Sequence, residues 1–172
     1  MSVKAEQPEQ DSIGRWLETQ NDALPGIDLT VEGIVDRIQA LAKYLMRSQE
    51  ETLRELSVGW AEWQVVRALR LAGKPYRLSP GQLADRSKLS SGAMTNRLDR
   101  LEEAGLVNRL PDPEDRRALQ IELTDKGRSL WERFLAAQGA KESRVAATLD
   151  ASEQAQLNDF LRRLAIAFER AS

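Results

Sequence analysis

The side chains able to do chemistry in this chain are hydroxyls, amides, carboxylates, lysines and arginines, because its 172 residues include no histidine and no cysteine. The lack of cysteine excludes a disulfide framework, a thiolate zinc site and a cysteine nucleophile. The lack of histidine excludes serine–histidine triads and histidine general bases. Two-carboxylate and Ser–Lys chemistries stay open, but the sequence has no glycine-rich phosphate loop and no metal-ligand spacing. We therefore expect no enzymatic activity, no cofactor and no metal site.

The segment from Ser90 to Ala104 predicts a helix with one apolar and one polar side. Its apolar positions are Met94, Leu98 and Leu101. The opposite side carries Ser91, Gly92, Thr95, Asn96, Asp99, Arg100 and Glu103. Small residues permit close approach, and hydroxyls and N-terminal N–H groups can bind phosphates. Asn96 can pair bidentately with adenine, and Arg100 can reach guanine or a phosphate. The pattern suits a helix that enters a major groove by its N-terminal end, although a solvated outer face has the same composition.

A shorter helix precedes this segment. Ser79, Pro80 and Gln82 form an N-cap, a proline at the first helical position and a capping-box residue. The helix is predicted over Pro80–Ser87, and its Leu83 and Ala84 can face the apolar side of the next helix across the turn 88–90. This arrangement is a helix-turn-helix.

Two short alternating segments, Leu106–Leu110 and Ala118–Leu123, predict a β-hairpin. The loop between them, Pro111–Arg117, contains two prolines and ends in Arg116 and Arg117. A stiff arm that presents arginines fits a narrow minor groove, where the negative potential is enhanced. Asp115 could hold the Arg117 guanidinium, although Asp–Arg pairs on exposed hairpins often contribute nothing.

The overall charge does not point to nucleic acid, because the formal net charge is −2. From Arg86 to Arg117 there are seven basic and six acidic residues, a local net charge of +1. Nucleic-acid binding by this segment would depend on geometry and not on a broad positive field.

Long amphipathic helices flank the central segment. The apolar spacing predicts helices over 28–47, 50–56, 60–71, 124–148 and from 150 onward, with a short helix at 12–19. Thr124 is expected to cap the helix over 124–148, and Asp150 with Glu153 forms a second capping box at the start of the last helix. We predict a mainly α protein with a small β-hairpin wing (α+β). Its expected parts are an N-terminal extension (1–27), dimerisation helices (28–59), a DNA-binding domain (60–123) and C-terminal dimerisation helices (124–172).

The apolar stripes of the flanking helices exceed what a central domain of about 60 residues can cover. Folding both ends of the chain into an intersubunit bundle would bury them and place two reading helices on one side of a homodimer, about one helical turn of DNA apart. A monomeric helical bundle with an appended wing is the alternative. The longest apolar runs span about five residues, against roughly 20 needed to cross a bilayer, and the first 12 residues form no signal peptide. We expect a cytoplasmic protein without membrane contact.

The central residues resemble the MarR family of winged helix-turn-helix regulators. The matching stretches are 78–84, 90–102, 105–107, 111–117 and 123–124. The resemblance covers about residues 30–170. It implies a homodimer that binds pseudo-palindromic double-stranded DNA, usually as a repressor and often released by a small molecule. It also implies that Thr95, Asn96 and Arg100 face the major groove and that Arg117, oriented by Asp115, enters the minor groove. The predicted DNA-binding residues are Ser90, Ser91, Gly92, Thr95, Asn96, Arg97, Arg100, Asp115, Arg116 and Arg117.

The segment is most similar to a subgroup of that family that responds to urate or related phenolic ligands. Trp16 and Arg97 match the subgroup, whereas Gln64 stands where an Asp is expected. Trp60 and Trp63 lie at the start of the helix that precedes the helix-turn-helix. They could line a pocket, although tryptophans at helical spacing are more often core. The predicted ligand-binding residues are Trp16, Trp60, Trp63, Gln64 and Arg97, for a small aromatic or phenolic effector.

The leading hypothesis is thus a ligand-responsive, DNA-binding transcriptional repressor. The competing hypothesis is a protein-interaction module that keeps the winged-helix shape without reading DNA. Its sequence cue is the acidic pair Asp99 and Glu103 on the outer side of the reading helix.

Overall fold

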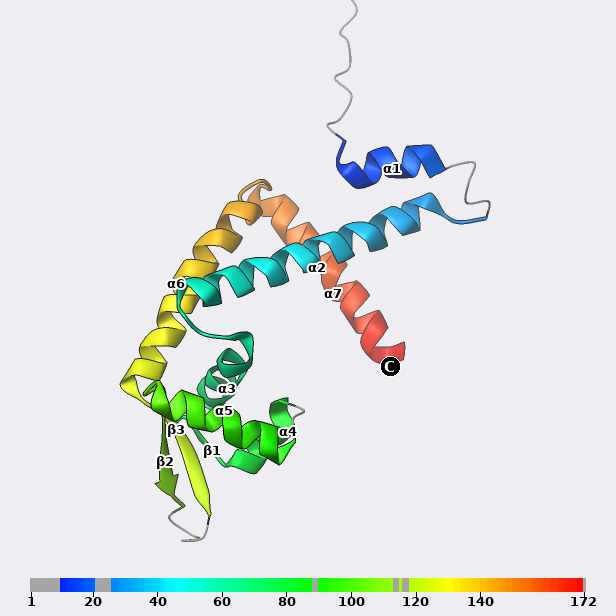
Figure 1. Ribbon diagram of the computed structural model, residues 1–172. Coiled ribbons are helices and arrows are strands. Elements are labelled where there is room, and N and C mark those ends of the chain that lie inside the picture. The colour runs from blue at the N-terminus through cyan, green and yellow to red at the C-terminus, as the bar shows by residue number, and fades with distance from the viewer. Residues whose placement is uncertain (1–9, 21–25, 88–89, 113–114, 116–117, 172) are drawn as a thin grey trace, which may run out of the picture. The chain divides into compact units, whose positions relative to one another are not determined.

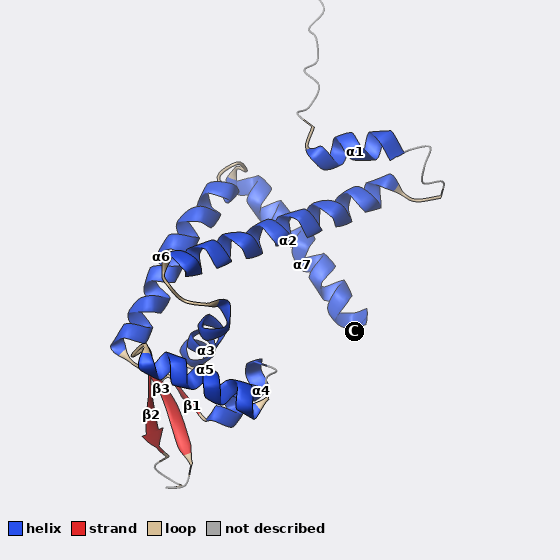
Figure 2. Ribbon diagram, viewed as in Figure 1, coloured by secondary structure: helices blue, strands red, loops and turns tan. Residues whose placement is uncertain are grey.

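Along the chain, helices precede and follow a small sheet, as predicted, and the one departure is that two predicted helices form a single continuous helix. The structure is a computed structural model that describes residues 10–20, 26–87, 90–112, 115 and 118–171 (Figure 1). The elements are α1 (Ser12–Gln20), α2 (Leu29–Glu55), α3 (Trp60–Leu71), β1 (Arg77–Leu78), α4 (Pro80–Ser87), α5 (Ser91–Glu103), β2 (Val107–Pro111), β3 (Leu119–Leu123), α6 (Asp125–Ala146) and α7 (Ala151–Ala171). The predicted class, mainly α with a β-hairpin wing, is confirmed (Figure 2).

The chain divides into two compact units, Met1–Ser48 and Gln49–Ser172, with the boundary inside α2. In the first unit, α1 is clasped to α2 by Arg37, whose Nε and Nη2 donate to the Asp11 carboxylate at 2.8 and 3.0 Å. Gly33 allows this approach, because a Cβ at that position would lie only 3.0 Å from the Leu17 side chain. The Asp28 carboxylate accepts from the Thr30 N–H at 2.9 Å and caps α2.

The second unit is organised around one apolar core. Its buried side chains come from the end of α2, from α3, α4, α5, all three strands and the first half of α6. They include Val65, Val66, Leu69, Leu78, Leu83, Met94, Leu98, Leu101, Val107, Ile121, Leu123, Leu130 and Phe134. The predicted apolar side of the reading helix is therefore confirmed, since Met94, Leu98 and Leu101 are each at most 2% exposed. This core fixes the orientation of α5 and leaves its other side at the surface.

The three strands form an antiparallel sheet in the order β1-β3-β2. β2 and β3 pair as a hairpin in which Arg109 lies opposite Ile121, and β1 adds Arg77 opposite Glu122. Gly127, in the first turn of α6, is required where that helix meets the sheet. A Cβ there would lie 2.3 Å from the Leu106 carbonyl oxygen.

The helix starts follow the predicted caps. The Ser79 hydroxyl accepts from the Gln82 N–H at 3.2 Å while the Gln82 side chain accepts from the Ser79 N–H at 2.9 Å. Asp150 and Glu153 exchange the same pair of bonds at the start of α7, at 2.9 and 2.8 Å. Thr124 caps α6 by accepting from the Gly127 N–H at 3.0 Å. All three sequence-predicted caps are confirmed.

The predicted break between residues 47 and 50 is wrong, because α2 continues without interruption to Glu55. The apolar stripe stops at Leu45, and the helix goes on with Ser48 and Thr52, which are buried although polar. Polar residues on the buried side hide the helical period from a pattern search. The helix ends before Ser57, whose backbone is left-handed at φ 58°.

Candidate nucleic-acid interface

The outer side of α5 presents small, uncharged hydrogen-bonding groups over its first two turns. Ser91, Gly92, Thr95 and Asn96 are exposed. Nothing lies within 4 Å of the place where a Cβ on Gly92 would be, so this end of the helix is open. Ser90 caps the helix by accepting from the Ala93 N–H at 3.3 Å. The free N–H groups of the first turn therefore point out of the same end that carries the small polar side chains.

Two of the three acidic residues in the second half of α5 are paired with an arginine of the hairpin. The Asp99 carboxylate accepts from Arg109 of β2 at 2.5 Å, and the Glu102 carboxylate lies 3.4 Å from the same guanidinium. Arg109 thus pairs with two carboxylates and ties α5 to the hairpin. Among residues that the structure describes, Glu103 has no ion pair and stays exposed at the C-terminal end.

Arginines of α5 lie beyond the neutral turns. Arg100 is 75% exposed and is held only loosely by Glu62 of α3, with 3.7 Å between the charged atoms. Arg97 is half-buried and has no ion pair within the described part of the chain. The N-terminal half of the outer face of α5 therefore carries hydroxyls and an amide, and its C-terminal half carries the Arg100 guanidinium, which is exposed and can bind a phosphate or a base.

The hairpin extends away from α3, α4 and α5 of the same unit (Figure 1). Its far end is ordered by the Asp112 side chain, which accepts from Gln120 at 2.5 Å and from the Asp115 N–H at 3.4 Å. The backbone closes across the same point, where the Asp112 N–H donates to the Ala118 carbonyl at 3.0 Å. The predicted minor-groove residues Arg116 and Arg117 lie outside the described residues, as does the contact predicted between Arg117 and Asp115.

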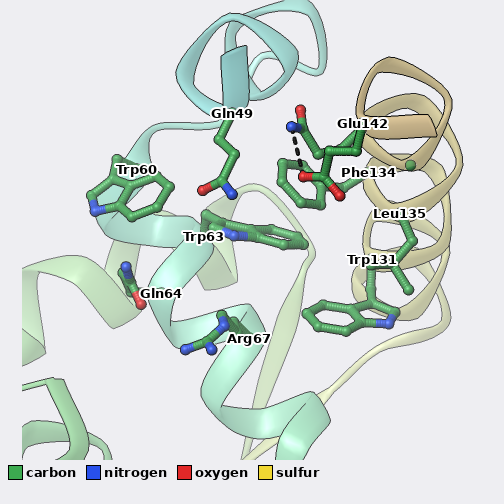
Figure 3. Close-up of a pocket in the computed structure, with 11 residues that line it drawn as sticks. Gln49, Trp60, Trp63, Gln64, Arg67, Trp131, Phe134, Leu135 and Glu142 are labelled. Atoms are coloured by element: carbon green, nitrogen blue, oxygen red, sulfur yellow. Dashed lines mark hydrogen bonds between the residues drawn. The ribbon is translucent and has the colours of Figure 1, made fainter. Parts of the chain in front are cut away.

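A cavity of about 490 Å³ lies in the second unit between the end of α2, α3 and α6 (Figure 3). Its wall is largely aromatic. Trp63 stacks on Trp131 with ring centroids 5.2 Å apart and planes at 14°, and its centroid is 4.0 Å from that of Phe134. Trp60 lines the cavity with a more open ring, 41% exposed. The polar lining consists of Gln49, Gln64, Arg67, Gln138 and Glu142.

Comparison with known proteins places this geometry in a family. The MarR family profile matches residues 60–119, from the start of α3 to the first residue of β3. The HTH-type transcriptional regulator PecS of Dickeya dadantii is 27% identical over 154 residues, 90% of each protein. The HTH-type transcriptional repressor MdtR of Bacillus subtilis is 30% identical over 132 residues, 77% of this chain and 83% of MdtR. The chain belongs to the MarR family.

Solved structures agree with the MarR assignment. The crystal structure of the YusO protein from Bacillus subtilis superposes with a TM-score of 0.72 at 28% identity, over 83% of this chain and 99% of that one. A mutant of MepR from S. aureus, bound to an oligodeoxyribonucleotide, has the same fold, with a TM-score of 0.64 at 19% identity over 78% and 97% of the two chains. The relatives are named as transcriptional regulators and repressors, which agrees with the expectation that this MarR-family chain is not an enzyme. Among the described residues, no helix has both the length and the apolar character that crossing a membrane requires.

The structure brings together only part of the predicted ligand set. Trp60, Trp63 and Gln64 line the aromatic cavity, whereas Arg97 is absent from its lining. Trp16 belongs to α1 in the other unit. Nothing in the fold or the comparisons assigns the chain to the urate-responsive subgroup, and that resemblance stays a prediction.

Several lining residues escaped the sequence reasoning. Arg67 follows Trp63 by one helical turn, and Phe134, Gln138 and Glu142 follow Trp131 at spacings of three and four. These spacings align each set along one helix side, and that signal was available. What the sequence could not tell is that the two sides face each other across a cavity.

Proposed function

We propose that this protein is a homodimeric, sequence-specific double-stranded DNA-binding transcriptional regulator that acts as a repressor and is released by a small-molecule ligand. The observation that carries the proposal is the outer side of α5, whose N-terminal turns are exposed, small, polar and uncharged while Asp99 and Glu102 are paired with Arg109. Such a surface can approach the phosphate backbone without electrostatic repulsion. The repressor names of relatives such as MdtR and the DNA-bound MepR neighbour support the same conclusion.

In this proposal α5 lies in the major groove and the hairpin tip in the adjacent minor groove. Ser90, Ser91 and Gly92 approach phosphates, Thr95 and Asn96 meet base edges, and Arg97 and Arg100 reach phosphate or guanine. Arg116 and Arg117 provide the minor-groove charge, and Asp115 orients Arg117. The ion pair between Arg109 and Asp99 holds the angle between helix and hairpin, so that both can engage one stretch of duplex.

Two exposed apolar helix sides support the homodimer. α7 buries none of its residues, and Leu157, Phe160, Leu161, Leu164 and Phe168 are each at least 38% exposed. On α2 the same holds for Val31, Ile34, Val35, Ile38, Leu41 and Leu45. Soluble monomers rarely expose continuous apolar patches of this extent. A second copy of the chain would supply apolar partners for these helices and pair two α5 helices for a pseudo-palindromic site.

The competing role, a winged-helix module that binds protein and not DNA, loses its sequence cue. That hypothesis relied on Asp99 and Glu103 as an acidic outer face. Asp99 is committed to Arg109 at 2.5 Å, which leaves Glu103 alone at the far end of the helix.

The experiment is selection of bound fragments from genomic DNA, followed by affinity measurements at several salt concentrations on the best fragment. Arg117→Ala should weaken binding to all sequences and lower the slope of log K against log salt by about one, because one phosphate-neutralising charge is lost. Arg144→Ala, on the far part of α6, removes an equal charge and should change neither value. Equal affinity of the wild type and Arg117→Ala at every salt concentration would contradict the assignment of the wing.

A further inference from the structure

The aromatic cavity holds two opposite charges that do not neutralise each other. Arg67 on α3 and Glu142 on α6 are the charged residues among those that line it. Neither makes an ion pair with any described residue, and both are exposed. In Figure 3 the Trp63 indole lies between the Arg67 guanidinium and the Glu142 carboxylate. The cavity therefore keeps a cation and an anion apart on either side of an aromatic surface.

The Glu142 carboxylate is held in place by a chain of hydrogen bonds. Its Oε1 accepts from Gln138 Nε2 at 2.9 Å, and Gln138 Oε1 in turn accepts from the Thr52 hydroxyl at 2.9 Å. Lys141 donates to the same hydroxyl oxygen at 2.9 Å. Gln138 and Thr52 are 3% and 0% exposed, so the bond between them is shielded from water, whereas Glu142 itself is exposed. A carboxylate fixed in this way is pre-organised to receive a donor on its other oxygen.

The aromatic wall fixes where a ligand ring can lie. Trp63 and Trp131 are already stacked at 5.2 Å, and insertion of a third ring between them would need about twice the spacing of one stacked pair. A ligand ring would therefore lie against this wall and not within the stack. The volume of about 490 Å³ is within the usual range of small-molecule pockets.

We propose that this cavity binds a dipolar aromatic ligand, a single ring that carries an ammonium group at one end and a carboxylate at the other. The ammonium group lies against the Glu142 carboxylate and the ring against the tryptophans, while the ligand carboxylate receives the Arg67 guanidinium. The inference deepens the proposed function, because it names the chemistry of the ligand that would release the DNA. A purely anionic phenolic acid would leave Glu142 facing its ring or its charge.

The test is calorimetric titration of the full-length protein with three matched probes. They are 4-(aminomethyl)benzoate, which has both charges, benzylamine, which has only the cation, and benzoate, which has only the anion. We expect the dipolar probe to bind roughly tenfold or more tightly than either single-charge probe, since a charge-assisted contact in a partly closed site has about that value. Tighter or equal binding of benzoate, or of the phenolic acid salicylate, overturns the proposal, as does the lack of binding by all probes at millimolar concentration.

Two variants assign the ends of the ligand. Arg67→Gln should weaken the dipolar probe and benzoate about tenfold and leave benzylamine unchanged, whereas Glu142→Gln should weaken the dipolar probe and benzylamine and leave benzoate unchanged. Arg133→Gln and Glu132→Gln, exposed on α6 and absent from the cavity lining, are the matched controls. If either variant affects all three probes equally, the two-ended assignment is wrong.

DNA binding is measured on the same preparations without ligand. Retained DNA binding combined with no preference for the dipolar probe defeats this inference alone and leaves the proposed function intact. Preference for the dipolar probe combined with no DNA binding to any genomic fragment defeats the proposed function and leaves the cavity assignment standing.

Discussion

The outer sides of α5 and α7 are both exposed, yet they differ in chemistry. α5 buries Met94, Leu98 and Leu101 on one side and offers hydroxyls, an amide and arginines on the other. α7 buries nothing and offers leucines and phenylalanines. One helix has therefore found its apolar partners within the chain, and the other has not.

The difference indicates what each surface meets. Apolar side chains on α7 gain free energy when they leave water, about 25 cal/mol for each Å², so a second protein surface is the partner that suits them. Hydroxyls and amides on α5 gain little from burial but can exchange hydrogen bonds with water for hydrogen bonds with a polar polymer. The exposed fractions of the side chains alone would not distinguish these two kinds of surface.

The largest expected effect comes from a charge placed on the apolar side of α7. Leu164→Glu should weaken the association of subunits roughly a hundredfold or more, because it removes about 1.5–3 kcal/mol of apolar burial and adds the desolvation of a carboxylate. Sedimentation velocity over a range of concentrations measures the change. Arg162→Gln, which alters the charge of the same helix equally, should leave association intact. Wild-type protein that sediments as single subunits at micromolar concentration would remove the basis of the comparison.

The next effect concerns base preference on α5. Asn96→Ala should relax discrimination at one base pair of each half-site by about 1–3 kcal/mol, because a bidentate side-chain contact to adenine is lost. Affinities for a set of operators substituted one base pair at a time measure this. Glu103→Gln, at the far end of the same face, should leave the preference unchanged. A uniform loss across all operators would make Asn96 a backbone contact.

Short-range features of this fold could be predicted from the sequence. The reciprocal bonds of Ser79 with Gln82 and of Asp150 with Glu153 depend on residues three apart, and both formed as expected. The apolar side of α5 could also be predicted, since its apolar residues recur with the period of a helix. Such features need no knowledge of what packs against them.

Features that depend on distant partners were missed. The continuity of α2 escaped because Thr52 is buried against Gln138, 86 residues away, and a hydrophobic pattern does not register a buried hydroxyl. Asp99 was counted as part of an outer acidic face because its partner Arg109 is on another element. The cavity required two helix sides to face each other, which no local spacing specifies.

A charge at the start of α5 should separate a reading surface from a merely solvated one. Gly92 stands in the first turn with open space around it, so Gly92→Glu fits sterically and its carboxylate should stabilise the helix N-terminus by about 0.3–1 kcal/mol. The same charge should weaken DNA binding about tenfold by repelling phosphates. Thermal unfolding and DNA titration measure the two effects, which are expected to have opposite signs. Raised stability with unchanged DNA affinity would make this face a solvated surface.

The smallest expected effect concerns the first unit, at the clasp of α1 on α2. The hydrogen bonds from Arg37 lower the pKa of Asp11 below its ordinary value, and the Gly14 N–H adds to this effect. The clasp is therefore fully present above the ordinary pKa of an aspartate and is lost as the pH falls through the lowered folded-state pKa. An NMR titration should find the Asp11 pKa lowered most in the wild type, less so in Arg37→Lys, which keeps the charge but loses the forked geometry, and least in Arg37→Gln, where the Gly14 N–H still donates to the carboxylate. Because this clasp does not involve α5, DNA affinity at neutral pH should be the same for all three proteins, and a loss in Arg37→Gln would show that the reading surface depends on α1.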